Sequence, residues 1–420
     1  MRRKLWLRAL APLLALAVLG AACGDDDDDG AAGSAQERAA GAMTETGAST
    51  LRAGLTGLLT EHVYLAALAT GSALRGDTAG FEAYAAALNG PTNSNTADLT
   101  AAITSAYGDD VGRAFDGLWR SDGHIPAFVA YTQAVAAGDQ AGADAAVTDL
   151  TAYAETFGTT LHSVNEHLPA DAVEEMVTMH ITSLKAVVDA QKAGDQPAVY
   201  TALREAYGHM GDMATVLAAA TAEKLPDAFD GDAESPAAGL RAGLTSLLRE
   251  HVFLASSATG AALGGRTAQF EAAAAALNGP TNSNTSDLVD AVRGVYGDEV
   301  GMAFDGLWRS DGHIPAVVAY TQALAAGDQA AADAAVADLL AYAATFGTTL
   351  HSVNEHLPTA AVEESVKLHA TTLKAVIDAQ KAGDPTQVAQ LLRAAVAHMS
   401  MTADTLAEAT ARKFPEKFEG

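Results

Sequence analysis

The sequence matches itself when it is shifted by 189 residues. The match has no gap and runs from Leu51 on Leu240 to Gly231 on Gly420, and all twelve histidines fall in register. Two copies of one structural unit therefore follow each other in the chain. We expect homologous lobes at residues 49–225 and 236–420, with the Pro-, Gly- and acid-containing stretch 226–235 as the linker between them.

Both lobes are predicted to be all-α helical bundles. Alanine and leucine dominate long segments whose apolar residues recur with a helical period, and no alternating run typical of a strand stands out. Three times in each lobe a histidine precedes a turn glycine by fourteen residues, and an aspartate often follows that glycine. A glycine after one helix and an aspartate before the next are typical of the tip of an αα-hairpin, so we expect three hairpins, about six helices, in each lobe. The pairs are His62 and Gly76, His124 and Gly138, His180 and Gly194, His251 and Gly265, His313 and Gly327, and His369 and Gly383.

These histidines are predicted to lie at one height in the bundle. Fourteen residues span about 21 Å of helix, so hairpins with level tips bring their histidines together. His209 lies fifteen residues after Gly194 on the return helix and comes back to the same level. A metal ion would satisfy several such buried imidazoles at once. The candidate ligands, with the neighbouring methionines, are His62, His124, His180, His209, Met210, His251, His313, His369, His398 and Met399.

Imidazole beside thioether favours copper, especially Cu(I), as the metal. Haem is an alternative, because bis-His or His/Met axial ligation also fits a helical bundle. A structural or interaction protein without a cofactor, in which the histidines are hydrogen-bonded core residues, is another. A di-iron site of the ferritin kind is disfavoured, because no glutamate is followed by histidine three positions later.

The run TFGTTLHSVNEHLP, at residues 156–169, is identical in the second lobe at residues 345–358. It is either a capped helix end or a second metal site, nearer the surface. The residues of that second site would be His162, Glu166, His167, His351, Glu355 and His356. Trp119 and Arg120, in another identical run, either cover the histidine layer or form ordinary packing and surface contacts.

The N-terminus is predicted to direct export. Residues 1–22 combine a basic start, an apolar run and small residues before Cys23, the only cysteine, which is the layout of a lipoprotein signal peptide. We expect a lipid on Cys23 that anchors the protein to the outer face of the cytoplasmic membrane, with Sec or Tat export left open. Residues 23–48, rich in acid, glycine and alanine, are expected to be a disordered tether.

The charge excludes nucleic acid as a partner. The chain has 25 basic and 52 acidic residues, and loss of the four basic residues of the signal peptide changes the net charge from −27 to −31. Phosphate binding needs the opposite sign, whereas metal cations are attracted. Protein partners cannot be read from the sequence.

Enzyme motifs are absent from the sequence, which contains no Gly-x-Ser-x-Gly, no nucleotide-binding loop and no cysteine nucleophile. This favours a binding protein over an enzyme. Through stretches such as LLTEHVYLAALATG, LKAVVDAQKAGD and REAYGHM, the chain resembles a group of helical, often lipid-anchored actinobacterial proteins that carry the label "copper amine oxidase" in genomes. The resemblance implies a connection with copper. It does not imply amine oxidation, because true copper amine oxidases are β-rich and use a tyrosine in an Asn-Tyr motif, which this sequence lacks.

Overall fold

The computed structural model describes residues 35–121, 123–310 and 312–418, and every regular element in these ranges is a helix. The all-α class is confirmed. In the first half the elements are α1 (Ala35–Met43), α2 (Gly47–Leu74), α3 (Thr78–Asn89), α4 (Asn95–Tyr107), α5 (Asp109–Asp116), the π-helical turn η1 (Gly117–Ser121), α6 (His124–Ala137), α7 (Gln140–Val164), α8 (Ala170–Ala193) and α9 (Gln196–Lys224). In the second half they are α10 (Pro236–Leu263), α11 (Thr267–Asn278), α12 (Asn284–Tyr296), α13 (Asp298–Arg309), α14 (His313–Ala326), α15 (Gln329–Val353), α16 (Thr359–Ala382), α17 (Pro385–Lys413) and α18 (Pro415–Phe418).

The helices of the second half repeat those of the first, with α10 to α12 and α14 to α17 each starting and ending 189 positions after its counterpart. The three expected hairpins of each half are present, as α2–α3, α6–α7 and α8–α9 in the first. Each tip glycine has φ between 66° and 75°, a left-handed conformation that glycine adopts without strain. Side chains of Asp77, Asp139 and Asp195 cap the return helices.

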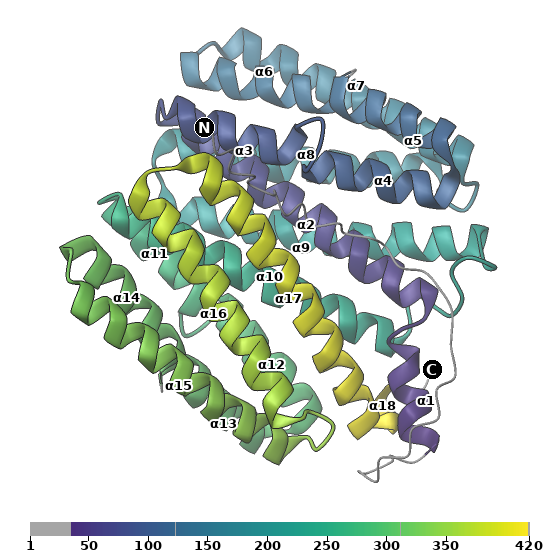
Figure 1. Cartoon of the computed structure of the whole chain (residues 1–420). Coiled ribbons are helices and arrows are strands. Elements are labelled where there is room, and N and C mark those ends of the chain that lie inside the picture. The colour runs from purple at the N-terminus through teal and green to yellow at the C-terminus, as the bar shows by residue number, and fades with distance from the viewer. Residues whose placement is uncertain (1–34, 122, 311, 419–420) are drawn as a thin grey trace, which may run out of the picture.

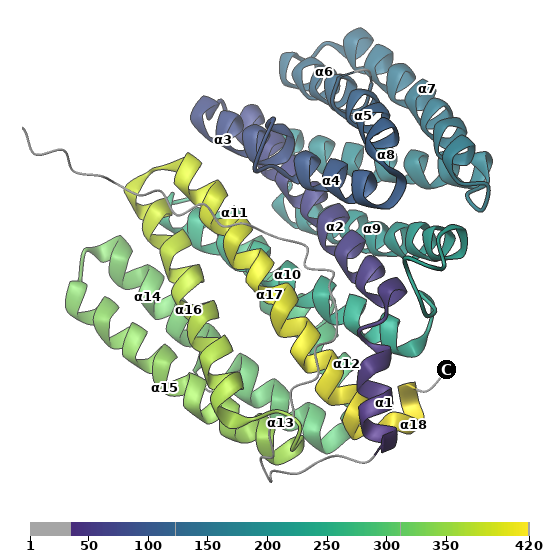
Figure 2. The ribbon, with the colours of Figure 1, turned by 45° about the vertical axis from the view of Figure 1, so that its right-hand side comes forward.

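Each half also contains helices that the hairpin pattern did not predict. In the first half, α4 and α5 lie between the first and second hairpins and are separated by Gly108, whose φ of 90° ends α4. Ser94 caps the start of α4 by accepting a hydrogen bond from the backbone of Ala97. Figures 1 and 2 place α2, α9, α10 and α17 in the middle of the molecule, with α6–α7 and α14–α15 far apart on its outside.

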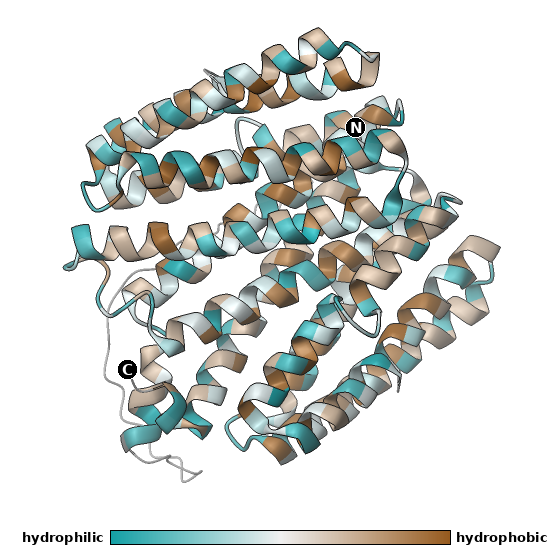
Figure 3. Ribbon diagram, turned by 180° about the vertical axis from the view of Figure 1, so that it is seen from behind, coloured by the Kyte–Doolittle hydropathy of each residue, from teal (hydrophilic) through white to brown (hydrophobic). Residues whose placement is uncertain are grey.

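The two halves share one hydrophobic core. Helix α2 packs against α10, and the rings of Tyr64 and Phe253, which occupy equivalent positions, stack with centroids 4.6 Å apart. Buried residues of both halves belong to the same apolar cluster, and Figure 3 shows apolar residues on the central helices. The junction between the halves is therefore a packed interface, although the predicted boundaries fall close to the end of α9 and the start of α10.

Ion pairs across this interface are reciprocal. Arg204 of the first half pairs with Glu250 and Asp287 of the second. The equivalent Arg393 pairs with Glu61 and Asp98, the equivalents of those two acids. Such an exchange of identical contacts is typical of a two-fold arrangement.

Part of the stretch 23–48, which we expected to be disordered, is helical, because residues 35–43 form α1. Ala40 is fully buried and α1 packs against α17, and such tertiary packing can stabilise a helix too short to persist alone. The linker 226–235 is also attached to the fold, since Asp230 accepts a hydrogen bond from the backbone of Gly47 and Ala233 is buried. Residues 1–22, which we predicted to be a signal peptide, and Cys23 lie outside the described residues.

None of the helices among the described residues combines the length and hydropathy needed to cross a membrane.

Candidate metal centre

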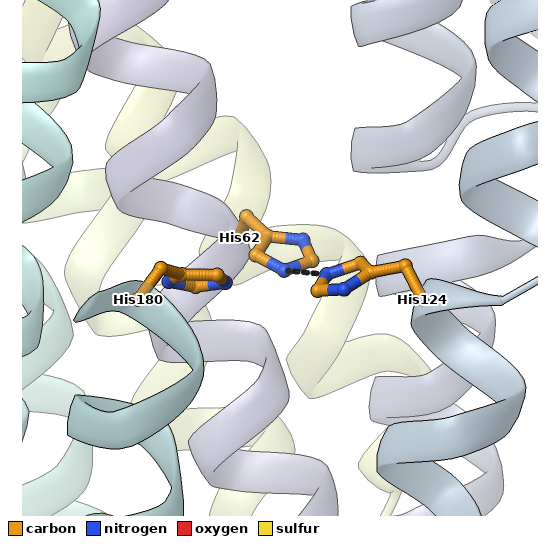
Figure 4. Close-up of side chains that lie close together, drawn as sticks. All are labelled: His62, His124 and His180. Atoms are coloured by element: carbon orange, nitrogen blue, oxygen red, sulfur yellow. Dashed lines mark hydrogen bonds between the residues drawn. The ribbon is translucent and has the colours of Figure 1, made fainter. Parts of the chain in front are cut away.

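Three of the predicted histidines of the first half converge at one point of the bundle. His62 lies in the middle of α2, His124 is the first residue of α6, and His180 lies in the middle of α8. Their relative exposures are 1%, 3% and 3%, so the site is inside the protein. Figure 4 shows the rings of His124 and His180 approaching His62 from opposite sides. The expectation that hairpins with level tips bring these histidines to one height is met.

The spacing of the triad suits a metal ion. One ring nitrogen from each histidine lies within 4.8 Å of the other two. The Nε2 atoms of His62 and His124 are 3.3 Å apart. Ligand nitrogens that lie about 2.0 Å from a tetrahedral ion are themselves about 3.3 Å apart. The pair therefore already has the separation of two ligands, and a modest shift of His180 would complete three-coordinate binding.

The second half repeats this arrangement with His251, His313 and His369. The Nε2 atoms of His251 and His313 are again 3.3 Å apart, and the three ring centroids are separated by 5.4 to 5.7 Å. Within the described residues these two triads are the only groups of three or more potential ligands with this geometry.

Several triad nitrogens have no hydrogen-bond partner among the described residues. Both nitrogens of His180 and both of His369 are in this state, as are Nδ1 of His62, His124 and His251. An unsatisfied buried polar atom costs about 1–3 kcal/mol, so such atoms are rare unless a ligand or water satisfies them. These unpaired nitrogens are the strongest indication that each triad binds a ligand such as a metal ion.

Burial keeps the triads uncharged at neutral pH. It lowers the pKa of His124 and of His313 to about 4, and that of His369 to about 3 with help from His313 and His398. For His62 and His180 burial, together with neighbouring histidines, lowers the pKa well below 6.5. A neutral imidazole is the form that binds metal, so protons compete little for these ligands at pH 7.

Aromatic side chains cover the triad. Trp119, from η1, has its ring centroid 5.1 Å from that of His62 and 4.7 Å from that of His124. Arg120 holds this turn in place by bonding Asp116 and the backbone carbonyl of Gly90. Of the two interpretations of Trp119, the covering role agrees with these contacts. Trp308 lies 4.7 Å from His313 in the second half, but on the regular helix α13, so the π-helical turn is specific to the first site.

Tyr153 is a site residue that the sequence did not reveal. Its ring stacks on that of His124 at 5.2 Å. A Cβ on Gly123 would lie 2.7 Å from the Tyr153 ring, so a glycine is needed where the chain passes into α6. Tyr153 looks like an ordinary core aromatic in the helical pattern of α7, and the packing of α7 on α6 places it beside His124.

His209 and His398, which we expected in the cluster, are not part of the two triads. The Nε2 of His209 donates to the carbonyl of Met176 at 2.8 Å, and that of His398 to the carbonyl of Ser365 at 3.1 Å. Both still lie close enough to lower the pKa values of His180 and His369. Met210 and Met399 are buried in the core, 1% and 4% exposed.

The residues of the alternative second site have other partners. His162 contacts the carbonyl of Leu168 through Nδ1, and Glu166 pairs with Lys224. His167 contacts Glu223. The buried Asn165 amide joins this helix end to α9 through the carbonyl of Ala220. In the second half His351 likewise contacts the carbonyl of Leu357, and Glu355 pairs with Lys413. The backbone N–H of His356 donates to the Asn354 side chain, as that of His167 does to Asn165. This geometry supports the capped helix end.

The low pKa values predict that the metal-free protein is destabilised by mild acid. Unfolded histidine binds a proton below about pH 6.5, whereas His124 and His313 do so only near pH 4 when folded. The unfolded state therefore binds more protons between these values, and stability falls as the pH falls. At pH 5 each of these two histidines should cost about 2 kcal/mol relative to pH 7.

Urea unfolding at several pH values, with a chelator present, measures this loss. The variant with both His124→Gln and His313→Gln should show a weaker pH dependence. An equal dependence in both proteins would contradict the assignment.

No protein-family model matches the chain, and no curated protein or solved structure matches it at a significant level.

Proposed function

We propose that the protein is a metal-binding lipoprotein of the cell envelope, in which each buried triad holds one copper ion. The observation that supports binding most directly is the pair of partnerless nitrogens of His180, buried beside two other imidazoles. A core with neither a cofactor nor an ordered water would keep these donors and acceptors unsatisfied.

Three features favour copper, and Cu(I) in particular. The groups that shift the pKa values of His62, His124 and His180 are burial and other histidines, with no carboxylate contribution. A buried site without anionic ligands suits a singly charged ion better than a doubly charged one, because the cost of burying charge rises steeply with that charge. Imidazole ligands suit copper, and the adjacent Trp119 ring is attracted to cations.

The geometry is less suitable for haem. An iron with two axial imidazoles carries a flat macrocycle between them, whereas the Nε2 atoms of His62 and His124 are only 3.3 Å apart and Trp119 packs on both rings. Zinc, which is doubly charged, is also disfavoured, because no nearby carboxylate contributes to the pKa shifts of these histidines and none would offset its charge. We therefore favour copper storage or buffering over catalysis.

Metal analysis tests this proposal. The protein without residues 1–34, purified from cells given copper, iron and haem, should contain about two copper ions per chain and show no Soret band. A Soret band would instead select haem, and a colourless protein free of metal would favour a purely structural role.

Tryptophan fluorescence should report copper binding. The only tryptophans outside the signal peptide are Trp119 and Trp308, and each contacts one triad. Copper bound to a triad is a short-range quencher, so two equivalents should quench most of the emission.

In the Trp119→Phe variant the remaining emission should come from Trp308 and report the second site alone. Emission that stays unchanged after two equivalents of copper would contradict binding beside the tryptophans.

The anchor is part of the proposal and has its own test. Cys23→Ser should move the protein from the membrane fraction to the soluble fraction of the cell envelope, because lipidation needs the thiol. A variant that stays with the membrane would show that another element holds it.

A further inference from the structure

A second site of a different kind lies between the two halves. A pocket of about 350 Å³ lies between the tips of the α2–α3 and α8–α9 hairpins of the first half and the α10–α11 turn of the second. Its volume falls in the range typical of sites for small molecules. Apolar side chains of Leu68, Val199 and Leu203 form part of its wall.

Two arginines, one from each half, line this pocket. Arg75 follows α2 and Arg266 precedes α11. Neither forms an ion pair with a described residue: Arg75 bonds the hydroxyl of Ser72, and Arg266 bonds Gln269 and the carbonyl of Gly260. Burial lowers the pKa of Arg75, and the positive charge of Arg266 lowers it further. The two guanidinium groups therefore repel each other. This is unusual in a chain with twice as many acids as bases.

The internal symmetry shows that the fold does not need these arginines. The position equivalent to Arg75 in the second half is Gly264, and the position equivalent to Arg266 in the first half is Asp77. The buried Tyr200, whose pKa responds to both arginines, corresponds to Ala389. The opposite side of the interface therefore packs without any of the three.

Arg266 also replaces a favourable residue. Asp77 caps α3 by accepting a hydrogen bond from Gly80, whereas Arg266 at the same position of α11 makes no side-chain cap. Aspartate is among the best N-cap residues, so the second half gives up helix stability at this turn. In return Arg266 gains only its hydrogen bonds to Gln269 and to the carbonyl of Gly260. A locally unfavourable residue of this kind is typical of a functional site.

We propose that this pocket binds a small organic anion, with its carboxylate or phosphate group between Arg75 and Arg266 and its apolar part against Leu68, Val199 and Leu203. Guanidinium groups bind such oxyanions with two parallel hydrogen bonds, and an anion between them would remove their mutual repulsion. The rest of this acidic protein repels anions, so the two arginines make the pocket the most favourable place for one.

Isothermal titration calorimetry with phenyl phosphate, benzoate and inorganic phosphate, at constant ionic strength, tests the proposal. The parent protein should bind at least one of these saturably with one site per chain. Phenyl phosphate and benzoate distinguish the two headgroups, and inorganic phosphate shows what the apolar part adds.

The test variant combines Arg75→Gly with Arg266→Asp, which are the residues of the equivalent side and should therefore fold. Its affinity for the preferred probe should fall at least about tenfold, since both charge-assisted contacts are lost. Arg113→Ala is the matched control: it removes an exposed charge paired only with Asp110 and should bind like the parent. Circular dichroism and copper content should be unchanged in all three proteins. No saturable binding to the parent, or equal binding by the double variant, would overturn the proposal.

Discussion

Replacing His180 and His369 together by alanine is expected to lower copper affinity at both triads by at least about 100-fold. Each change removes one of three ligands, and even the loss of an outer-shell partner commonly lowers metal affinity 10- to 100-fold. Because neither nitrogen of these two histidines has a hydrogen-bond partner, the metal-free variant loses only packing. Competition titrations against a copper chelator measure the affinity.

The matched control replaces His209 and His398, each of which donates to a backbone carbonyl. Alanine there should cost about 1–3 kcal/mol of stability and leave copper affinity close to that of the parent. The reverse pattern, with binding kept in the first variant and lost in the second, would show that the ligands are misassigned.

Replacing Glu61 by glutamine is expected to lower the free energy of unfolding by about 3–5 kcal/mol. Its carboxylate, 5% exposed, contacts both Arg249 and Arg393 across the interface between the halves. A neutral amide leaves the buried Arg249 guanidinium, only 7% exposed, without a counterion, and leaves Arg393 with Asp98 alone. Chemical unfolding of the metal-free protein measures the loss.

Asp98→Asn is the control for this prediction. Asp98 contacts the same Arg393, but its side chain is 49% exposed. Exposed ion pairs contribute about 0–1 kcal/mol, so this change should have a small effect. Similar losses in the two variants would show that burial of the Glu61 contacts does not determine their strength.

The triads could be predicted because a helix advances by a fixed distance per residue. Level hairpin tips at Gly76, Gly138 and Gly194 place histidines fourteen residues away at one height, and the structure brings those three together. His209 has a similar distance from the tip, but height alone does not fix the direction of a side chain. Its ring turns to the carbonyl of Met176.

The arrangement of the two halves could not be predicted in the same way. A duplication predicts two similar units, but it does not say how one packs on the other. The reciprocal ion pairs of Arg204 and Arg393, and the pocket shared by Arg75 and Arg266, join residues far apart in the sequence. Two-fold packing of the halves brings these residues together, and no local sequence pattern predicts that packing.

The additional helices have a local cause that the hairpin pattern concealed. Gly108 and Gly297, both with φ of 90°, divide the stretch between the first and second hairpins into two helices. A glycine at such a position is a helix-end signal, so the sequence does contain a local signal for α4 and α5. Helix α1, at residues 35–43, has no such local signal. It is short and packs on α17, which is far away in the sequence, so the sequence alone does not predict it.

Anomalous diffraction at the copper edge, from crystals of the copper-loaded protein, tests the central claim most directly. The account predicts two strong peaks per chain, one between His62, His124 and His180 and one between His251, His313 and His369. Each peak should lie about 2.0 Å from one nitrogen of each of its three histidines. Copper-loaded crystals with no peak at either triad, or with peaks only at surface carboxylates, would contradict it.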